Sequence, residues 1–436
     1  MHIETRVVAN WANYPTATAE VATPDTVAEA RDYLLARDRL LARGNGRCYG
    51  DAALGPHLLS TLHLNRLLGF DAENGIVHCE AGLLLTDLLR TIVPAGWFFQ
   101  VTPGIKSITI GGAIASDVHG KNHPVKGCWS NWLRSFDLML ADGQVITCSR
   151  MENPALFWQT CGGMGWTGVI LAARFQLLRI TSSQMQQTTR RAADFDGLFR
   201  YMAEQPATYA AAWIDTTNQK GRGAAFFAEH VDGSARDALI FAEKTPRQVP
   251  FFAPSWLLNP LSMRAYNELV FQKNRPGEQL VGLDPYFYPL DALGHWNRLY
   301  GRRGFIQYQF CLPEAQSFDG LKRILETIRR SPETPFLSVL KRHGERPAEA
   351  VHSFPIRGYS LALDFPRTRT IFGLVRQLDA IVAELGGRIY LSKDACSSVR
   401  VSGVLPGTFG SEKFYSLLKE RLMNPSRPQP TPTPSL

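Results

Sequence analysis

Glycine is concentrated in three segments of the amino-terminal half, at residues 43–51, 107–123 and 161–170. Because glycine lacks a Cβ atom, it adopts positive φ angles and lets another backbone or a ligand approach closely. Successive N–H groups in such turns can point at the phosphates of a nucleotide. Taken singly, the first segment is explained at least as well by a tight turn, and the third about equally well by a bend from loop to strand. Three of them in one stretch of chain predict the walls of a single ligand site.

The second segment carries the strongest sign of chemistry. It is rich in Gly, Ala, Ser and Thr, and it ends on His119, Lys121 and His123, which can donate protons or positive charge. A lone histidine is usually structural, but three such side chains directly after what is expected to be a loop of small residues favour a site. The first segment does not fit the G-x-x-x-x-G-K-[ST] nucleotide loop, and no G-x-G-x-x-G precedes a helix there. These motifs alone leave the ligand open.

Composition and charge limit the class of protein. Of the 436 residues, 45% are hydrophobic and 20% are charged, which is compatible with two well-packed domains or one elaborated domain. There are 47 Lys and Arg against 39 Asp and Glu, a net charge of +8. This excess is no polynucleotide signature and no basic–aromatic motif accompanies it, so no nucleic-acid partner is expected. A mildly basic surface suits anionic lipid headgroups or a phosphorylated substrate.

Cysteine spacing and hydropathy indicate the compartment. The seven cysteines are scattered without a C-x-x-C pair, which is typical of reduced thiols in a cytoplasmic protein, and no metal site is expected. No apolar run approaches the ~18 to 20 residues that span a bilayer. The N-terminus lacks a basic segment followed by an apolar stretch, so export is not expected. The sequence predicts a cytoplasmic protein.

Helix and strand patterns divide the chain into an α+β protein of two domains. Residues 5–180 alternate helices and strands around the glycine-rich segments, with the first helix beginning after Thr26. Residues 181–385 interleave aromatic-rich strands with amphipathic helices, which predicts an antiparallel sheet covered by helices. Residues 386–423 form a carboxy-terminal segment, and the proline-rich residues 424–436 are expected to be a disordered tail.

Several longer motifs point to a family. They are GRCYGD at 46–51, TIGGAIASDVHGKNH at 109–123, HWNRLYGRRGFIQYQF at 295–310, FLSVLKRHG at 336–344 and GGRIYLSKD at 386–394. Over about residues 5 to 400 the chain resembles flavoproteins of the vanillyl-alcohol-oxidase superfamily, which share the FAD-binding fold of p-cresol methylhydroxylase (the PCMH-type fold). Within it the chain is most similar to the decaprenylphosphoryl-β-D-ribose oxidases. The resemblance implies that residues 5–180 bind FAD, that 181–385 bind substrate, and that 386–423 return to the flavin.

The same resemblance implies the cofactor contacts. Members with covalently linked FAD carry the linking histidine in the first loop, where this chain has Arg47, so FAD is expected to be bound non-covalently. Backbone amides hold most of a pyrophosphate in such sites, which agrees with the glycine density. The residues expected to contact FAD are Gly44, Gly46, Arg47, Tyr49, Gly111, Gly112, Ala115, His119, Gly120, Ile170 and Tyr390.

The reaction implied by the resemblance is hydride transfer from C2 of a polyprenyl-phosphoryl ribofuranose to the flavin, giving a 2-keto sugar. Such a reaction needs a base near the C2 hydroxyl, and Lys393 matches the active-site lysine of the family. His119 and Lys121 match its flavin-side catalytic pair. The residues expected to bind substrate are Gln307, Gln309, Lys341 and Tyr49. The two glutamines alternate with Tyr308, so on a strand both face the same side.

Partners and location follow from the same implied reaction. A separate NAD(P)H-dependent short-chain reductase would complete epimerisation to the arabinose donor used in cell-envelope or glycan arabinosylation. The lipid-linked substrate implies peripheral contact with the inner face of the membrane. The chain departs from the family at Ser360, where relatives have Asn, at Ala362, where they have Cys, and at Phe287-Tyr288, where they have Tyr-His. These positions surround the expected substrate pocket, so they bear on the substrate more than on the chemistry.

Two alternatives remain open at this point. One is FAD-dependent oxidation of a soluble aldonolactone or alditol, against which the Lys341 and FIQYQF matches and Arg47 weigh. The other is a non-redox protein that binds FAD and docks a partner enzyme. A bound flavin that no sugar reduces would favour this second alternative.

Overall fold

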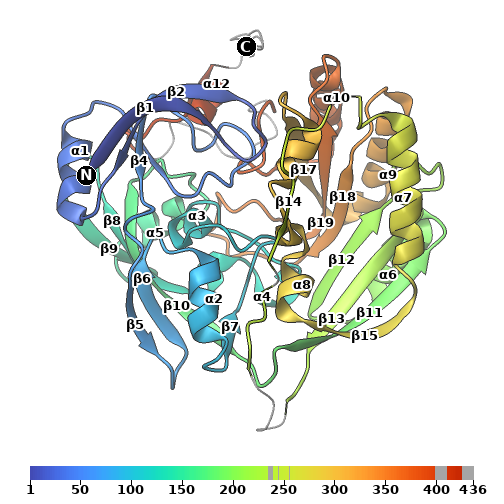
Figure 1. Cartoon of the computed structure of the whole chain (residues 1–436), viewed down its shortest axis with the longest axis horizontal. Coiled ribbons are helices and arrows are strands. Elements are labelled where there is room, and N and C mark those ends of the chain that lie inside the picture. Colours follow the sequence, from blue (N-terminus) through green and yellow to red (C-terminus); the bar gives the residue numbers. More distant parts are fainter. Residues whose placement is uncertain (234–238, 244, 255, 398–409, 425–436) are drawn as a thin grey trace.

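The chain folds into two halves, each built around β-sheet, which stand side by side in Figure 1. This computed structural model describes all residues except 234–238, 244, 255, 398–409 and 425–436. The amino-terminal half is blue to teal in the figure, and most of the second half is green to orange. The predicted α+β class, with an antiparallel, helix-covered sheet in the second half, is confirmed.

The amino-terminal half contains two sheets. In the smaller one, in the order β1-β2-β4-β3, β4 pairs in parallel with both β2 and β3. Its strands are β1 (His2–Ala9), β2 (Thr16–Thr23), β3 (Leu41–Arg43) and β4 (His57–Ser60). The larger one has the order β5-β6-β10-β8-β9, with β7 also on β10. Its strands are β5 (Leu67–Asp71), β6 (Ile76–Glu80), β7 (Trp97–Phe99), β8 (Leu133–Met139), β9 (Val145–Ser149) and β10 (Val169–Arg179).

Short helices connect these strands. The first begins where predicted, because the Thr26 side chain accepts a hydrogen bond from the Glu29 N–H and caps it. In the second, Leu85, Leu88, Leu89 and Ile92 share one face and are buried in the largest core of this half. The helices are α1 (Val27–Leu35), α2 (Leu85–Ile92), α3 (Ile110–Ala115), α4 (His123–Lys126), η1 (Trp129–Asn131) and α5 (Pro154–Thr160).

An eight-stranded antiparallel sheet forms the second half, in the order β15-β11-β13-β12-β18-β19-β17-β20. One of its faces packs against α6, α9 and α10 through residues such as Tyr308, Leu340 and Leu363. The strands are β11 (Gln184–Ala192), β12 (Tyr209–Ile214), β13 (Gly223–His230), β15 (Gly277–Gly282), β17 (Phe305–Pro313), β18 (Leu337–His343), β19 (Gly358–Pro366) and β20 (Arg388–Ile389). The helices are α6 (Phe195–Glu204), α9 (Glu314–Arg330) and α10 (Ile371–Glu384).

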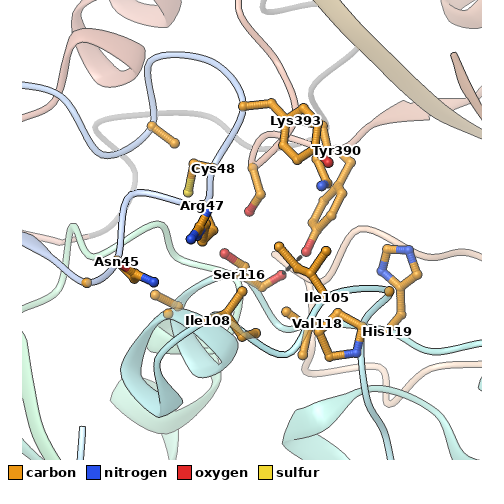
Figure 2. Close-up of a pocket in the computed structure, with 18 of the residues that line it drawn as sticks. Asn45, Arg47, Cys48, Ile105, Ile108, Ser116, Val118, His119, Tyr390 and Lys393 are labelled. Atoms are coloured by element: carbon orange, nitrogen blue, oxygen red, sulfur yellow. Dashed lines mark hydrogen bonds between the residues drawn. The ribbon is translucent and has the colours of Figure 1, made fainter. Parts of the chain in front are cut away.

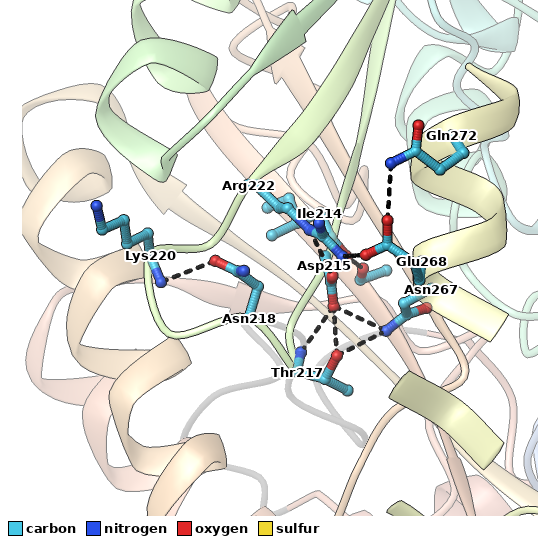
Figure 3. Close-up of polar contacts among 10 residues, drawn as sticks. Ile214, Asp215, Thr217, Asn218, Lys220, Arg222, Asn267, Glu268 and Gln272 are labelled. Carbon is cyan, nitrogen blue, oxygen red and sulfur yellow. Dashed lines mark hydrogen bonds and ion pairs between the residues drawn. The ribbon is translucent and has the colours of Figure 1, made fainter. Parts of the chain in front are cut away.

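A long insertion between β13 and β15 contains α7 (Pro260–Lys273), which is fastened to the sheet by a polar network (Figure 3). Buried Asp215 accepts hydrogen bonds from Asn267 Nδ2 of α7 at 2.9 Å, from Thr217 N at 3.0 Å and from Arg222 Nε at 3.0 Å. Arg222 also forms an ion pair with Glu268 of α7. The insertion also contains β14 (Arg247–Gln248), and between β15 and β17 the chain forms α8 (Leu283–Phe287), η2 (Pro289–Ala292), β16 (Leu293–Gly294) and η3 (Trp296–Tyr300).

After β20 the chain returns to the amino-terminal half. Helix α12 (Leu417–Met423) packs there through Leu418 and Leu422. The predicted disordered tail lies outside the described residues except for Asn424, which ends α12. Among the described residues, no helix is long and apolar enough to cross a membrane.

Candidate active site

A cavity of about 340 Å³ lies where the three glycine-rich segments face the eight-stranded sheet. Figure 2 shows its lining around Arg47, Cys48, His119 and Lys393. Of the residues expected to contact FAD or to carry chemistry, all but one line this cavity. They are Gly44, Gly46, Arg47, Tyr49, Gly111, Gly112, Ala115, His119, Lys121, Ile170, Gln307, Gln309, Lys341, Tyr390 and Lys393.

The exception is Gly120, which is not among the lining residues. A Cβ at this position would lie 2.6 Å from Asn122 Oδ1 and 3.0 Å from Thr102 O. Glycine is therefore required here by close packing behind the cavity wall. The structure gives no support to the expected contact between Gly120 and FAD.

The first two glycine-rich segments are packed directly together. A Cβ on Gly44 would lie 2.3 Å from Thr109 Oγ1, and Gly46 has a φ of +60° that glycine adopts without strain. Thr109 Oγ1 accepts a hydrogen bond from Gly112 N at 3.1 Å. Asn45 Nδ2 reaches across to Ser107 O at 2.7 Å. The glycines thus bring two backbones together at one end of the cavity.

The second segment differs from the prediction in its local structure. It was expected to be a loop of small residues, but residues Ile110–Ala115 form helix α3. Glycine costs a helix about 1 kcal/mol relative to alanine, so the sequence alone argues against one here. The Thr109 cap and the burial of Ile110 and Ile114 in the core stabilise it instead.

The opposite wall is the open face of the eight-stranded sheet. Gln307 and Gln309 of β17 line the cavity, while Tyr308 between them points into the core under the helices. The same alternation on β18 and β19 brings Lys341, Ser360 and Ala362 to the cavity. Both glutamines therefore face the same side, as the spacing predicted.

Five cationic residues line this cavity: Arg43, Arg47, Lys121, Lys341 and Lys393. Among the described residues, none of them forms an ion pair with a carboxylate. Burial lowers the pKa of Lys121 to about 7, with a further contribution from nearby Lys341, and lowers the pKa of Lys341 to about 8. Like-charged, buried amines in a cavity that no described carboxylate lines favour an anionic ligand, because binding one relieves their repulsion.

Aromatic rings hold three of these cations in place. Lys393 Nζ lies 3.5 Å from the Tyr49 ring centroid, and Lys121 Nζ lies 4.0 Å from that of Tyr286. The Arg47 guanidinium lies 4.2 Å from the Trp11 ring. Cation–π contact orients a charge without neutralising it, so the cations remain available to a ligand.

His119 is buried beside the lysines. Gln309 Nε2 donates to His119 Nε2 at 3.1 Å, and His119 Nδ1 has no partner among the described residues. Burial, with Lys341, His123 and Lys393 nearby, holds the pKa of His119 well below its usual range, so the ring is neutral at pH 7. A neutral imidazole with a free ring nitrogen can exchange a hydrogen bond with a ligand.

Asp364 is a residue that the sequence analysis missed. It is fully buried on β19 and accepts a hydrogen bond from Gln307 Nε2 through Oδ1, while its Oδ2 has no partner among the described residues. Burial raises its pKa, and the opposite charge of Lys393 lowers it. Burial lowers the pKa of Lys393, and Asp364 opposes that shift. The alternation of side chains along a strand could have identified Asp364, because Ser360, Ala362 and Asp364 share one face.

A buried ionic triad fixes the loop that carries Lys393. Arg421 of α12 donates to Asp51 at 2.8 Å and to Asp394 at 2.9 Å, and all three are largely buried. Tyr49 N also donates to Ser392 O at 2.9 Å. The first glycine-rich segment, α12 and the lysine loop are therefore one structural unit, although they are far apart in sequence.

The positions that depart from the family also lie at the cavity or next to it. Phe287, Ser360 and Ala362 line it. Ser360 Oγ is hydrogen bonded to His343 Nε2 at 2.7 Å. Tyr288 does not line the cavity, and its hydroxyl is hydrogen bonded to Thr102 Oγ1 at 2.7 Å.

Comparison with known proteins decides the family. Residues 15–149 match the model of an FAD binding domain. The chain is 32% identical over 405 residues to a decaprenylphosphoryl-beta-D-ribose oxidase of Mycolicibacterium smegmatis, covering 87% of both chains. This chain belongs to the PCMH-type family of FAD-dependent oxidoreductases.

Two other relatives match smaller parts of this chain. An uncharacterized protein of Streptomyces coelicolor is 30% identical over 334 residues, which are 72% of this chain and 89% of the relative. An L-gulonolactone oxidase of Mus musculus is 32% identical over 174 residues, which are 38% of this chain and 39% of the relative. Similarity to the second is thus confined to a minor part of either chain.

The cavity fits the cofactor of this family. Gly44, Gly46, Gly111 and Gly112 line one end of the cavity, where backbone N–H groups without neighbouring side chains can approach a pyrophosphate. Unpaired cations near it balance phosphate charge, and the buried Arg47 Nε has no partner among the described residues. The residues that would hold FAD are those of the glycine-rich segments, with Arg47 and Tyr390. The Tyr390 hydroxyl donates to Ser116 O at 3.1 Å, which joins the two walls (Figure 2).

Proposed function

We propose that this chain oxidises the C2 hydroxyl of a polyprenyl-phosphoryl-β-D-ribofuranose to the 2-keto sugar. The observation that carries the proposal is the cluster of lysines, together with two glutamines, in a cavity of an FAD-dependent oxidoreductase that no described carboxylate lines. Lysines suit a substrate phosphate, and glutamine amides suit sugar hydroxyls. The similarity to the mycobacterial oxidase, over 87% of both chains, supports the same substrate class.

In this proposal Lys393 takes the proton. Its buried amine has a lowered pKa, so a useful fraction is unprotonated near neutral pH and accepts the C2 hydroxyl proton. Bound FAD would supply the hydride acceptor for C2, so that the sugar would lose two electrons and the C2–O bond would become a carbonyl while Lys393 takes the hydroxyl proton. Gln307 and Gln309 hold the ring hydroxyls, and His119 is fixed by Gln309 beside them.

The other cations position the substrate. Lys121 and Lys341 lie on opposite walls of the cavity, on the amino-terminal half and on β18. Both have lowered pKa values, and a bound phosphate raises them again by stabilising the charged amines. Substrate binding is therefore expected to take up protons at pH 7. The Lys393 amine lies against the face of the Tyr49 ring, and this contact keeps it in place.

Several further points of the proposal rest on the family resemblance. FAD is held non-covalently, because Arg47 stands where other members carry the linking histidine. The 2-keto sugar is reduced by a separate NAD(P)H-dependent short-chain reductase, which completes epimerisation to an arabinose donor. Acid precipitation tests the first point: all yellow colour should leave the protein, and flavin that stays attached would contradict it.

The experiment that tests the function is anaerobic mixing of the FAD-loaded protein with a short-chain polyprenyl-phosphoryl ribose. Flavin absorbance should bleach with this substrate but not with ribitol, free ribose or an aldonolactone. The matched control is the same lipid phosphate carrying arabinose, whose C2 hydroxyl has the opposite configuration. A flavin that stays oxidised with every sugar would reject the proposal and favour a docking protein.

A second candidate is oxidation of a soluble aldonolactone. The local similarity to L-gulonolactone oxidase favours it, although only 39% of that relative is covered. Bleaching by L-gulonolactone at least as fast as by the lipid-linked ribose would decide for this candidate. Lys121 and Lys341 argue against this candidate, because neither forms an ion pair among the described residues and a neutral lactone carries no charge that could pair with them.

A further inference from the structure

A strip of large apolar side chains is exposed on the insertion that leads into α7. Phe251 and Trp256 are each 71% exposed and Leu261 is 76% exposed, and Phe252 and Leu257 lie between them in sequence. We call these five residues the apolar strip. Soluble proteins rarely expose so many large apolar groups together unless the surface binds something.

Hydrogen bonds and apolar packing fix the apolar strip to the rest of the chain. Ala253 N donates to Arg298 O at 2.9 Å, and Arg298 Nη1 donates to Val249 O and Pro250 O, each at 2.9 Å. Leu258, which lies between Leu257 and Leu261 in sequence, packs against the apolar cluster that contains Tyr300. Helix α7, which carries Leu261, is capped by Asn259 and tied to the sheet by the Asp215 network (Figure 3). The exposure is therefore a property of the folded chain.

Arginines surround the strip. A second cavity, of about 360 Å³, is lined by Arg303, Arg367 and Arg369 together with Pro254 and Leu258 of the insertion. We call it the arginine pocket. Arg298 and Arg302 flank the Phe252 ring at 5.9 and 5.6 Å. Among the described residues, none of these five arginines forms an ion pair with a carboxylate.

This face lies next to the candidate active site. Leu258 of the insertion, and Leu290 and Tyr49 of the active-site cavity, belong to one apolar cluster. Strand β14, just before the strip, pairs with β16, which follows the cavity-lining residues 289 and 290. In Figure 1, β14 stands between the two halves and α7 at the right edge. A surface that covers the strip would thus border the active-site cavity.

We propose that the apolar strip and the arginine pocket bind a membrane surface that contains anionic phospholipids. Aromatic and leucine side chains favour the interfacial layer, and unpaired arginines favour acidic headgroups. A lipid phosphate occupies the arginine pocket, where planar guanidinium groups can bind two phosphate oxygens at once. The proposal rests on the proposed function in one respect, because it places this face where a lipid-linked substrate enters. Membrane binding itself is measured without turnover.

The test is co-sedimentation of the full-length, FAD-loaded protein with vesicles. Vesicles of phosphatidylcholine and phosphatidylglycerol should pull the protein down, and phosphatidylcholine vesicles alone should do so at least tenfold more weakly. Trp256→Ser with Phe251→Ser, and Arg303→Gln with Arg369→Gln, should each weaken binding at least tenfold. Binding that is equal for both vesicle types, or unchanged in both double variants, would overturn the proposal.

Matched controls use side chains elsewhere on the surface. Met151→Ser with Val7→Ser removes two apolar groups that are 93% and 67% exposed. Arg174→Gln with Arg376→Gln removes the same charge from two exposed arginines. Both controls should sediment like the unchanged protein. Flavin absorbance and Tm establish that every variant is folded, and Trp256→Phe, which keeps the apolar contact, should retain at least half of the binding.

Two further outcomes separate this proposal from others. If the strip joins two copies of the chain, light scattering will show a dimer that Trp256→Ser dissociates, and vesicles will not bind; that result overturns the proposal. The proposed function is measured separately, by bleaching with short-chain substrate in solution. Vesicle binding without bleaching would reject the function alone, and bleaching without vesicle binding would reject the membrane surface alone.

Discussion

The properties of the candidate site begin with single side chains whose charges are unusual for their surroundings. Lys121, Lys341 and Lys393 are all placed where burial lowers the amine pKa. Ordinary lysines titrate near pH 10.4 and cannot act as bases at neutral pH. Here the balance between burial and one carboxylate, Asp364, sets how readily Lys393 accepts a proton. Two predictions concern the transfer of that proton to Lys393.

Replacing Lys393 by alanine should remove the base and leave the cofactor site intact. We expect the rate of flavin reduction to fall by about 10²- to 10⁴-fold or beyond detection, the range typical for loss of a general base. FAD should remain bound, because Lys393 is only one of many lining residues. Stopped-flow absorbance measures the rate, with exposed Lys220→Ala as control. A variant that reduces its flavin at the normal rate would rule this lysine out.

Asp364→Asn should move the pH dependence of flavin reduction. The charged carboxylate raises the pKa of Lys393, so its removal lowers that pKa further. Because the unprotonated amine is the base, the rate should rise with pH through the Lys393 pKa, and this rise should shift to lower pH in the variant. Asparagine can still accept the hydrogen bond from Gln307. A pH–rate profile that moves upward or stays in place would contradict the coupling.

At the scale of elements, strand alternation and helix caps place these side chains. Neighbouring strands β17, β18 and β19 each present polar residues to the cavity and apolar residues to α9 and α10, so one period-2 pattern builds both the site and the core. Helix α7 stands away from the cavity, and its polar network with Asp215 fixes it to the sheet. Its contribution to stability is directly testable.

Asn267→Ala should destabilise the protein by about 1–3 kcal/mol, the typical cost of leaving a buried polar partner without its hydrogen bond. Asn267 is 2% exposed, and its side chain donates to Asp215 at 2.9 Å. Urea unfolding measures the change in free energy. Glu268→Gln, one residue along the same helix but exposed, should stay within about 0.5 kcal/mol of the original. Equal effects of both substitutions would show that the buried hydrogen bond contributes no more to the free energy of unfolding than the exposed side chain does.

For the whole molecule, the decisive contacts join segments that are distant in sequence. Arg421 near the carboxy terminus binds Asp51 of the first glycine-rich segment and Asp394 beside the candidate base. Burial favours the neutral acid at Asp394, but Arg421 and two backbone N–H groups hold its pKa below the usual range. The carboxy-terminal segment is therefore part of the active-site scaffold.

Arg421→Met should destabilise the whole chain by about 3–5 kcal/mol, because it leaves two buried carboxylates without their cation. Thermal unfolding of the FAD-loaded protein measures this loss. Exposed Arg323, which pairs with Glu384 on the surface, supplies the control, and Arg323→Met should change stability by at most about 1 kcal/mol. A stable Arg421→Met variant with normal flavin reduction would show that the triad does not hold the lysine loop.

Local patterns were sufficient for part of this protein. The capped start of α1, the paired glutamines on β17 and the glycine density around the cofactor loops each depend on neighbours a few residues apart, so the sequence predicted them. Helix α3 was missed, because its glycines oppose a helix that only the surrounding core stabilises. The contact of Gly120 with FAD stays a prediction, and the structure shows that a Cβ there would crowd Asn122 and Thr102.

The sequence by itself determined which segments could hold a nucleotide cofactor and which strand faces could build a core, since backbone freedom and side-chain period are local properties. Only the tertiary structure decided that Lys121, Lys341 and Lys393 meet in a cavity that no described carboxylate lines, and that buried Asp364 lies within electrostatic reach of Lys393. It also decided that the apolar strip borders the arginine pocket. Burial and charge pairing depend on contacts between distant segments, and these exist only once the chain has folded.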